Sequence, residues 1–192
     1  MDKNYWEERY LNKETGWDVG YVTTPLKYYI DQIKNKELKI LIPGAGNGYE
    51  AEYLFNNGFK NIYVVDIAQQ PLQNIAKRIP ELKNNLLYQD FFSLNDTYDL
   101  IIEQTFFCAL LPELRKKYVE KMYSLLSANG KLVGLLFCFP LTESGPPFGG
   151  SKEEYIDLFK QKFELKTLEK SYNSITPRAN NELFFIFNKI EE

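Results

Sequence analysis

The sequence predicts an α/β fold built on a doubly wound, mostly parallel sheet of seven strands. Short apolar runs of strand length alternate with amphipathic helical segments along the chain, and most connections are too long for hairpins. The last two strand-like runs, 163–171 and 182–189, flank a short loop and predict an antiparallel C-terminal edge. With 192 residues, we expect a single domain over 1–192.

Each element of this fold has a local signal in the sequence. Besides the terminal pair, we expect strands at 38–42, 62–66, 86–88, 98–102 and 132–139. Expected helices span 3–11, 25–36, 49–56, 70–79, 113–126 and 152–161. Thr24 is the predicted cap of the second helix, with Pro25 in its first turn. In such sheets ligands bind beyond the carboxyl ends of the strands, so the residues that follow strands are the functional candidates.

The composition excludes several kinds of site. The chain has no histidine, which rules out Ser-His-Asp and Cys-His nucleophiles and histidine-containing zinc sites. Its two cysteines, Cys108 and Cys138, are too few for an all-cysteine zinc site and lack CxxC spacing. They fit a reduced compartment better than a disulfide framework. We therefore expect no metal site and a cytoplasmic protein.

The charge pattern narrows the class of partner. A net charge of −3 supplies no attraction for nucleic acid or an anionic membrane. The first ten residues are too charged for a signal peptide, and the longest apolar stretch, 132–141, is too short to span a bilayer. We expect a small-molecule partner, no nucleic acid, no membrane, and a monomer or weak homodimer.

A glycine-rich loop follows the first predicted strand and opens a helix. Gly44, Gly46 and Gly48 have the spacing GxGxG, which differs from the GxGxxG of dinucleotide-binding folds. Glycine allows a positive φ and close approach of a ligand, and the helix N-terminus presents unpaired N–H groups. By itself the loop also fits simple turn chemistry.

Two acidic residues end the next two predicted strands. Asp66 lies 20 residues after Gly46, where a carboxylate can accept both hydrogen bonds of a ribose diol. Asp90 can accept from the exocyclic amino group of adenine while a neighbouring ring or aliphatic side chain covers the base. The alternatives are a helix-capping Asp66 and an ordinary loop residue at Asp90. Together, these strand ends predict a nucleoside site without an obvious place for a pyrophosphate.

This arrangement resembles the cofactor site of class I S-adenosylmethionine-dependent methyltransferases. Further motifs resemble the thiopurine methyltransferase family, most closely its halide/thiol methyltransferase branch, over nearly the whole chain. These motifs are WEERY at 6–10, GWDVG at 16–20, Pro25-Leu26, IPGAGNG at 42–48, DFF at 90–92, FCA at 107–109, GPPF at 145–148, and Ser174-Ile175-x-x-Arg178. The WEERY and GPPF motifs are far more specific than the glycine loop.

The resemblance implies S-adenosyl-L-methionine as cofactor and assigns residues to it. The N-terminal aromatic residues would close over the cofactor, which makes 1–23 a lid segment and 24–192 a Rossmann-like core. Glu50 is the candidate for the cofactor's ammonium group, because Ile42 stands where many methyltransferases have an acid. Gln104 stands where plant members carry a tyrosine near the transferred methyl group. The expected cofactor-binding residues are Trp6, Tyr10, Trp17, Gly44, Gly46, Glu50, Asp66, Ile67, Asp90, Phe91 and Gln104.

The expected reaction is in-line methyl transfer to a small anionic nucleophile, such as a thiol, bisulfide or a halide. An anionic nucleophile needs alignment and desolvation rather than a general base, so no catalytic residue is assigned. The aromatic residues fit a dry pocket. Anchoring of the N-terminal segment on the core would explain Trp6 and Trp17 equally well, and simple packing is the alternative for Phe106 and Phe107. The expected acceptor-pocket residues are Phe106, Phe107, Arg115, Pro147, Phe148 and Arg178.

Three other functions stay open at the level of sequence. The first is methyl transfer to a thiopurine or another heterocyclic thiol. The second is a nicotinamide-dependent oxidoreductase, which the GxGxG spacing disfavours. The third is a cofactor-binding module without catalytic activity.

Overall fold

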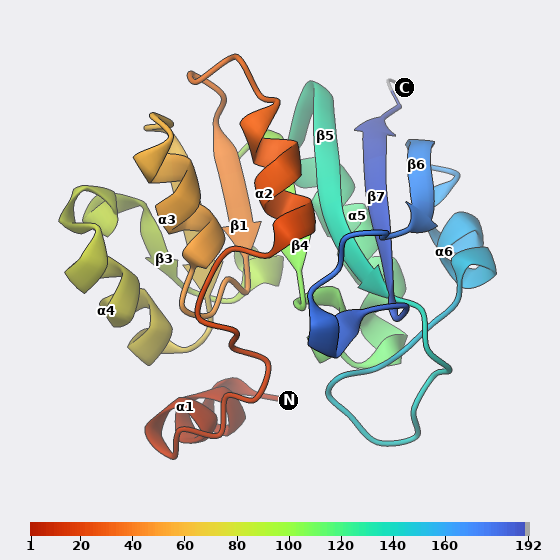
Figure 1. Ribbon diagram of the computed structural model, residues 1–192, viewed down its shortest axis with the longest axis horizontal. Helices are drawn as coiled ribbons and strands as arrows, with labels where there is room; N and C mark the ends of the chain where they lie inside the picture. The colour runs from red at the N-terminus through yellow and green to blue at the C-terminus, as the bar shows by residue number, and fades with distance from the viewer. Residues whose placement is uncertain (191–192) are drawn as a thin grey trace. The chain divides into compact units, whose positions relative to one another are not determined.

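The computed structural model describes residues 1–190, which divide after Leu94 into two compact units. Seven β-strands run through the two units, and helices connect most of them (Figure 1). Of the five strand pairings assigned within the units, three are parallel, and the two made by the C-terminal strand are antiparallel. No helix within residues 1–190 is long and apolar enough to cross a membrane.

The first unit contains three parallel strands in the order β3-β2-β1. The strands are β1 (Ile40–Pro43), β2 (Ile62–Asp66) and β3 (Leu86–Tyr88). Its helices are α1 (Lys3–Leu11), α2 (Thr24–Asp31), α3 (Tyr49–Asn56) and α4 (Gln69–Arg78), with short 3-10 turns at η1 (Pro80–Asn85) and η2 (Phe91–Ser93). Every residue of β1 is buried, as its uninterrupted apolar sequence predicts for a strand covered on both faces. Parallel pairing brings the carboxyl ends of these strands to one edge.

The second unit contains four strands in the order β4-β5-β7-β6. They are β4 (Tyr98–Gln104), β5 (Leu126–Phe137), β6 (Phe163–Lys170) and β7 (Glu182–Lys189). The helices are α5 (Arg115–Leu125) and α6 (Lys152–Phe159), with 3-10 turns at η3 (Phe107–Ala109), η4 (Pro112–Leu114) and η5 (Thr176–Arg178). Because β7 is antiparallel to β5, its first residue, Glu182, pairs with Phe137 at the carboxyl end of β5.

Aromatic rings fill the core of the second unit. Phe185 and Phe187 have centroids 4.6 Å apart, and Phe187 lies 5.0 Å from Phe159. Tyr118 of α5 makes an edge contact with Phe107, with centroids 5.0 Å apart. Each of these side chains is at most 1% exposed, so packing accounts for much of the chain's aromatic content.

Three element boundaries differ from the sequence expectation. α2 ends at Asp31 rather than near residue 36, because the chain turns away there and Asn35 accepts the Glu37 amide in a local turn, 3.0 Å apart. The N-cap of α2 is Thr23 rather than Thr24, and it makes no side-chain capping bond. β5 begins at Leu126 rather than 132, because Leu126 already pairs with Tyr98.

The start of α5 also differs from the expectation. Residues 112–114 form a 3-10 turn, so the α-helix begins at Arg115 instead of residue 113. The other expected strands and helices are confirmed to within two residues at each end. The expected antiparallel edge is confirmed.

A buried carboxylate fixes the turn that follows β4. Glu103 is 0% exposed and accepts hydrogen bonds from the amides of Phe106 (2.9 Å) and Phe107 (3.0 Å). The Tyr118 hydroxyl donates a third bond at 2.8 Å. Burial nevertheless raises the pKa of the Glu103 carboxyl to about 7, because these bonds compensate desolvation only in part.

This pKa predicts how stability depends on pH. The native state holds the Glu103 proton up to about pH 7, whereas the unfolded chain releases it near pH 4.3. The free energy of unfolding should therefore fall by up to about 3 kcal/mol, relative to the Glu103→Gln variant, as pH rises through this window. Urea unfolding at pH 5 and pH 7.5 measures the difference. Glu113→Gln, at an exposed position, is the control, and parallel pH profiles for wild type and Glu103→Gln would contradict the prediction.

Candidate functional site

The glycine loop between β1 and α3 depends on left-handed backbone. Gly44, Gly46 and Gly48 have φ values of 55°, 52° and 65°, which side-chain-bearing residues rarely adopt. The Gly44 amide donates to the carbonyl of Val65, 2.8 Å away, which ties the loop to the end of β2. A Cβ on Gly48 would lie 2.5 Å from Cδ1 of Ile75, so α4 leaves no room for a side chain there.

Asp66 ends β2 beside this loop. One carboxylate oxygen accepts the Gly46 amide at 3.2 Å, and the other accepts the Ala68 amide at 2.8 Å. Burial raises the pKa of this carboxyl to about 6, so it is mostly ionised at neutral pH and can still accept further hydrogen bonds. Asp66 and the neighbouring Ile67 are both half-buried. Asp66 and Gly46, predicted from their spacing to belong to one site, are in direct contact.

The N-terminal aromatic residues form a cluster over the glycine loop. Trp17 packs edge-on against Trp6 and Tyr10, with ring centroids 5.5 and 5.9 Å away. A Cβ on Gly46 would lie 2.9 Å from the Tyr10 hydroxyl and 3.8 Å from Trp17 Nε1. Burial raises the pKa of the Tyr10 phenol above its ordinary value, so it stays a neutral hydroxyl. The structure thus brings Trp6, Tyr10 and Trp17 together with Gly46.

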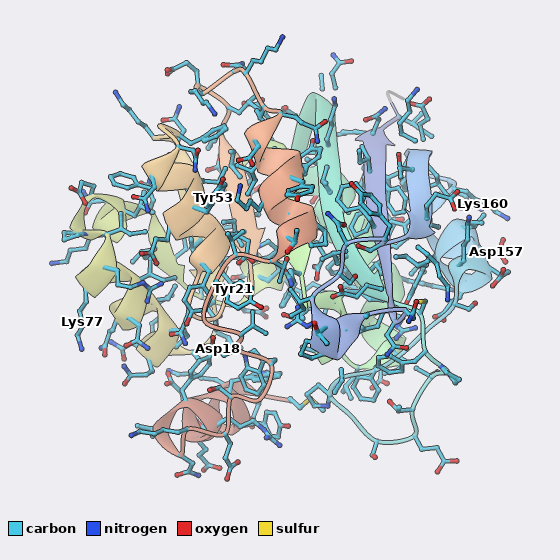
Figure 2. The ribbon with its side chains drawn as sticks, in the orientation of Figure 1. Asp18, Tyr21, Tyr53, Lys77, Asp157 and Lys160 are labelled. Carbon is cyan, nitrogen blue, oxygen red and sulfur yellow. The ribbon has the colours of Figure 1, made fainter. Side chains whose placement is uncertain are left out.

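Polar residues that the sequence analysis did not assign attach this N-terminal segment. The Asp18 carboxylate accepts hydrogen bonds from the side chains of Asn47, in the glycine loop, and Tyr49. Asn74 of α4 donates to Asn47 at 2.9 Å and extends the network. Asp18 lies in the loop after α1 (Figure 2). Its place within the GWDVG motif was the signal available in the sequence.

Glu7 of α1 makes a second attachment. Its carboxylate accepts the amide of Gln69, at the first residue of α4, at 2.7 Å. It also accepts the Tyr88 hydroxyl at 3.4 Å. A carboxylate at a helix N-terminus satisfies an amide that has no partner within the helix.

The remaining expected residues of the first unit lie at the strand and helix ends around the loop. Asp90 is exposed and accepts the Phe92 amide at 2.9 Å, so it caps its own 3-10 turn. Phe91 is buried, and its ring contacts Phe92. Glu50 is buried in the first turn of α3. Asp90 therefore has a local role, whatever else it binds.

In the second unit, the turn after β4 carries an unusual backbone conformation. Gln104 ends the strand and is half-buried, and Thr105 has a positive φ of 60°. A β-branched residue in this region is strained, and such strain persists only where the surroundings fix the chain. The three hydrogen bonds to Glu103 supply that constraint.

Two of the expected acceptor residues, Arg115 and Arg178, are buried beside carboxylates. Arg115 pairs with Glu154 and donates to the carbonyl of Gly149 at 2.7 Å. Its guanidinium carbon also lies 4.9 Å from the centroid of Phe107. Arg178 lies 3.7 Å from a carboxylate oxygen of Glu182. Each guanidinium is therefore compensated, as a buried charge requires.

The other expected acceptor residues differ in how deeply they are buried. Phe107 is 1% exposed and belongs to the aromatic core, whereas Phe106 is half-buried. The amide of the buried Phe148 donates to the carbonyl of Cys108 at 2.8 Å. Pro147 accepts a hydrogen bond from the Thr142 hydroxyl at 3.1 Å. The GPPF segment is thereby attached to the turn after β4.

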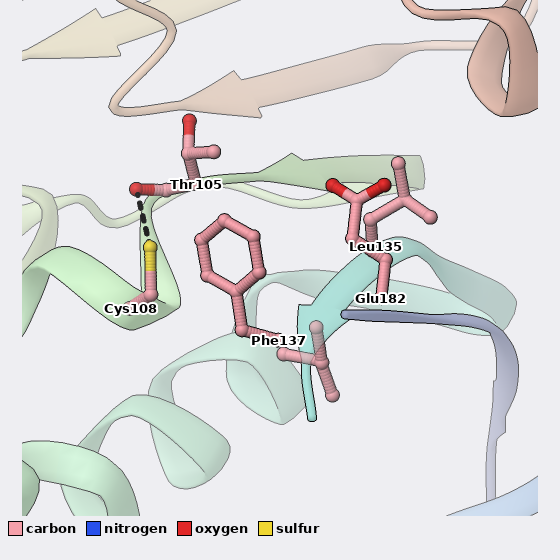
Figure 3. Close-up of a pocket in the computed structure, with 6 residues that line it drawn as sticks. Thr105, Cys108, Leu135, Phe137 and Glu182 are labelled. Atoms are coloured by element: carbon pink, nitrogen blue, oxygen red, sulfur yellow. Dashed lines mark hydrogen bonds between the residues drawn. The ribbon is translucent and has the colours of Figure 1, made fainter. Parts of the chain in front are cut away.

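A small pocket opens at the carboxyl ends of β4 and β5 (Figure 3). Its volume of about 10 Å³ accommodates the centre of one water-sized group. The Cys108 thiol donates to the carbonyl of Thr105 at 3.3 Å along one side. The lining residues are Thr105, Cys108, Leu135, Leu136, Phe137 and Glu182. Glu182, which the sequence analysis did not assign, is the charged member of this set.

Known proteins are similar in sequence to this chain over most of its length. The chain is 28% identical over 184 residues to the probable thiol methyltransferase 2 of Arabidopsis thaliana, which covers 92% of this chain and 81% of that protein. It is 27% identical over 197 residues to the thiocyanate methyltransferase 1 of Brassica oleracea, covering 99% and 87% of the two chains.

Solved structures share the fold. A Burkholderia thailandensis 1,6-didemethyltoxoflavin-N1-methyltransferase, with S-adenosylhomocysteine bound, superposes with a TM-score of 0.79 at 16% identity, covering 98% of this chain and 87% of that one. The magnesium protoporphyrin IX methyltransferase of Synechocystis PCC 6803 gives 0.74 at 13% identity, covering 99% and 98%. These likenesses confirm the predicted fold class, the class I methyltransferase fold with its seven-stranded sheet and antiparallel C-terminal strands.

The family assignment rests on the whole described chain. The sequence pattern of the thiopurine S-methyltransferase (TPMT) family matches residues 1–190. That match includes the glycine loop, Asp66 and the aromatic N-terminal segment. The protein is therefore a methyltransferase that uses S-adenosylmethionine, and the chain belongs to the thiopurine S-methyltransferase family.

Proposed function

We propose that the protein transfers the methyl group of S-adenosylmethionine to a small sulfur or halide nucleophile: a thiol, bisulfide or iodide. The observation that carries this proposal is the pocket at the carboxyl ends of β4 and β5. It is small, and the apolar side chains of Leu135, Leu136 and Phe137 line part of it. A large, polarisable and weakly hydrated nucleophile loses little on entering such a site. The names of the plant relatives, a thiol and a thiocyanate methyltransferase, support the same class.

On the cofactor side, we propose that Asp66 accepts hydrogen bonds from the ribose diol. Its half-buried, largely ionised carboxylate suits this role. The left-handed glycines at 44 and 46 let the backbone approach the ligand closely. Ile67 and Phe91 supply apolar cover for the adenine, Asp90 an acceptor for its amino group, and Glu50 a partner for the ammonium group. Gln104 completes the proposed set.

The N-terminal segment, residues 1–23, acts in this proposal as a lid. Its aromatic cluster of Trp6, Tyr10 and Trp17 lies on Gly46 of the glycine loop. Indole faces attract a sulfonium by about 0.5–2 kcal/mol. A closed lid also excludes water, which strengthens the alignment of nucleophile and methyl group.

The chain's own residues contribute alignment and desolvation to the reaction. S-adenosylmethionine supplies an electrophilic methyl group on a sulfonium, and the positive charge disappears as the nucleophile attacks. Phe106, Phe148 and Pro147 form the proposed apolar rim of the acceptor site. An anionic nucleophile such as iodide or bisulfide can attack without first losing a proton, so this part of the substrate range requires no general base.

The two buried arginines are each paired with a carboxylate. Such paired arginines favour weak binding of a small anion over tight binding of a polyanion. Arg115 and Arg178 each lie beside a glutamate, so neither presents a full positive charge to a ligand. We propose that Arg178, next to the pocket-lining Glu182, orients the acceptor. Arg115 supports the GPPF segment through the Gly149 carbonyl.

A heterocyclic thiol such as a thiopurine is the second candidate acceptor. The family name favours it. A purine ring needs far more room than one water-sized group, so this candidate requires the rim around the pocket to open. Parallel assays with iodide, bisulfide and a thiopurine separate the two acceptor classes.

We also propose a reducing, cytoplasmic location and small-molecule partners only. Cys108 and Cys138 are both free thiols in the fold. A reducing compartment keeps such thiols unpaired. The net charge of −3 gives no support for nucleic acid as a partner.

Replacing the ribose-binding carboxylate tests the cofactor site. Asp66→Ala should weaken binding of S-adenosylmethionine by about 1.5–3 kcal/mol, the scale of a charge-assisted pair of hydrogen bonds. Isothermal titration measures the dissociation constant. Asp31→Ala, at an exposed position on α2, is the matched control and should bind like wild type. Unchanged affinity in Asp66→Ala would remove this residue from the site.

Shortening one lid side chain tests the closure. Trp6→Ala should raise KM for S-adenosylmethionine about 5- to 30-fold, because it removes one indole face and part of the cover. Leu11→Ala, at a 69% exposed position of the same helix, should leave KM within about twofold. Steady-state kinetics and thermal unfolding are measured together. The lid role is refuted if Trp6→Ala lowers Tm but leaves KM unchanged.

A further inference from the structure

The pocket in the second unit contains a buried carboxylate that the proposed reaction has not used. Glu182 is the first residue of β7 and is 2% exposed. Antiparallel pairing places it opposite Phe137, so it lies at the edge where β4 and β5 end. Figure 3 shows its side chain among those of Thr105, Cys108 and Phe137 around the pocket.

Glu182 is held by two residues of the Ser174-x-x-x-Arg178 segment. The Ser174 hydroxyl donates to one carboxylate oxygen at 2.7 Å. Arg178 lies 3.7 Å from the other oxygen, longer than an ideal hydrogen bond. A carboxylate has about four acceptor positions, so these partners orient Glu182 without exhausting its capacity to take a proton.

The electrostatic surroundings make Glu182 a stronger base than an exposed glutamate. Burial raises the pKa of its carboxyl, against the opposing effects of Ser174 and Arg178. Cys108 and Cys138 both interact electrostatically with Glu182, Cys108 also with Glu103 and Cys138 also with Lys170, and burial raises the pKa of both thiols. They therefore stay protonated and add no competing charge.

The neighbouring buried acid, Glu103, cannot fill the same role. Its carboxylate already accepts three hydrogen bonds, from two amides and Tyr118, and it is fully buried. It is also absent from the residues that line the pocket in the described chain. Of these two buried carboxylates, Glu182 is the one that a ligand in the pocket can touch.

We propose that Glu182 is the general base for neutral thiol acceptors, an inference that rests on the proposed function. As the thiol sulfur forms its bond to the methyl carbon, its proton moves to a Glu182 carboxylate oxygen. The bond from that carbon to the sulfonium sulfur breaks, and its electron pair remains on the sulfur of S-adenosylhomocysteine. Glu182 then releases the proton to water. The sum is thiol plus S-adenosylmethionine giving thioether, S-adenosylhomocysteine and one proton.

Iodide provides a built-in control because it carries no proton. Glu182→Gln keeps the size and the hydrogen-bonding capacity of the side chain but cannot act as a base. For an alkyl thiol such as 2-mercaptoethanol, kcat/KM should fall about 10²- to 10³-fold. For iodide it should stay within about threefold. Glu169→Gln, on the exposed part of β6, should change neither.

Two further readouts distinguish a base from a structural residue. With bisulfide, a small acceptor that is already anionic, Glu182→Gln should keep most of the wild-type rate. With 2-mercaptoethanol, the pH dependence of kcat/KM in the variant should follow the ionisation of the free thiol, near pH 8–10, instead of that of the enzyme. Ser174→Ala, which removes only the orienting bond, should show a smaller loss with the same preference for neutral thiols.

The possible outcomes separate this inference from the function on which it depends. Equal losses with iodide and thiols, or no loss with either, would overturn the role of Glu182 as a base. A wild-type protein that methylates iodide but no thiol would overturn it as well. A wild-type protein inactive on every nucleophile, although it binds S-adenosylmethionine, would overturn the proposed function itself. If Glu182→Gln does not fold, Ser174→Ala provides the test. A lower ratio of the thiol rate to the iodide rate in this variant supports the role of Glu182, and an unchanged ratio contradicts it.

Discussion

The contact between Asp66 and the Gly46 amide is the interaction on which the candidate cofactor site depends. It joins the carboxyl end of β2 to a loop that begins at the carboxyl end of β1, and the Gly44 bond to Val65 reinforces it. The loop can follow this path only with left-handed backbone at three glycines. The aromatic cluster and the Asp18 network then rest on a loop whose shape is already fixed. Parallel pairing of β1 and β2 is thus the physical origin of the site.

In the second unit, several charged side chains are buried at the end of the sheet, and each has a partner. Glu103 is satisfied by amides and a tyrosine, and Arg115 and Arg178 by carboxylates. Burying an unpaired ion costs several kcal/mol, so these pairings are a condition of the fold as much as a device for binding. These pairings also bear on the chemistry of the pocket. The carboxylate of Glu182 is the one that both belongs to such a pair and lines the pocket.

Local sequence signals predicted the elements better than their ends. Runs of strand length correctly located all seven strands, and the uninterrupted apolar run of β1 is buried throughout. The errors have two causes: local turns set the end of α2 and the start of α5, whereas a long-range pairing sets the start of β5. The pairing of Leu126 with Tyr98 lengthens β5, and a 3-10 turn at 112–114 delays α5. Strand pairing across the chain overrides local preference at such boundaries.

The sequence by itself determined the fold class, the family and the spacing of Asp66 from the glycine loop. These features depend on hydrophobic periodicity and on the residues that follow each strand, both of which are local in the sequence. It did not indicate that Asp18 and Glu7 fasten the N-terminal segment, nor that Arg115 and Arg178 are compensated. Those facts depend on partners that are distant in sequence, such as Asn47, Gln69 and Glu154. Only the tertiary structure decides which oxygen meets which donor. For the same reason Glu182, an ordinary acid at the start of a strand, emerged as a pocket residue only after antiparallel pairing set it beside Phe137.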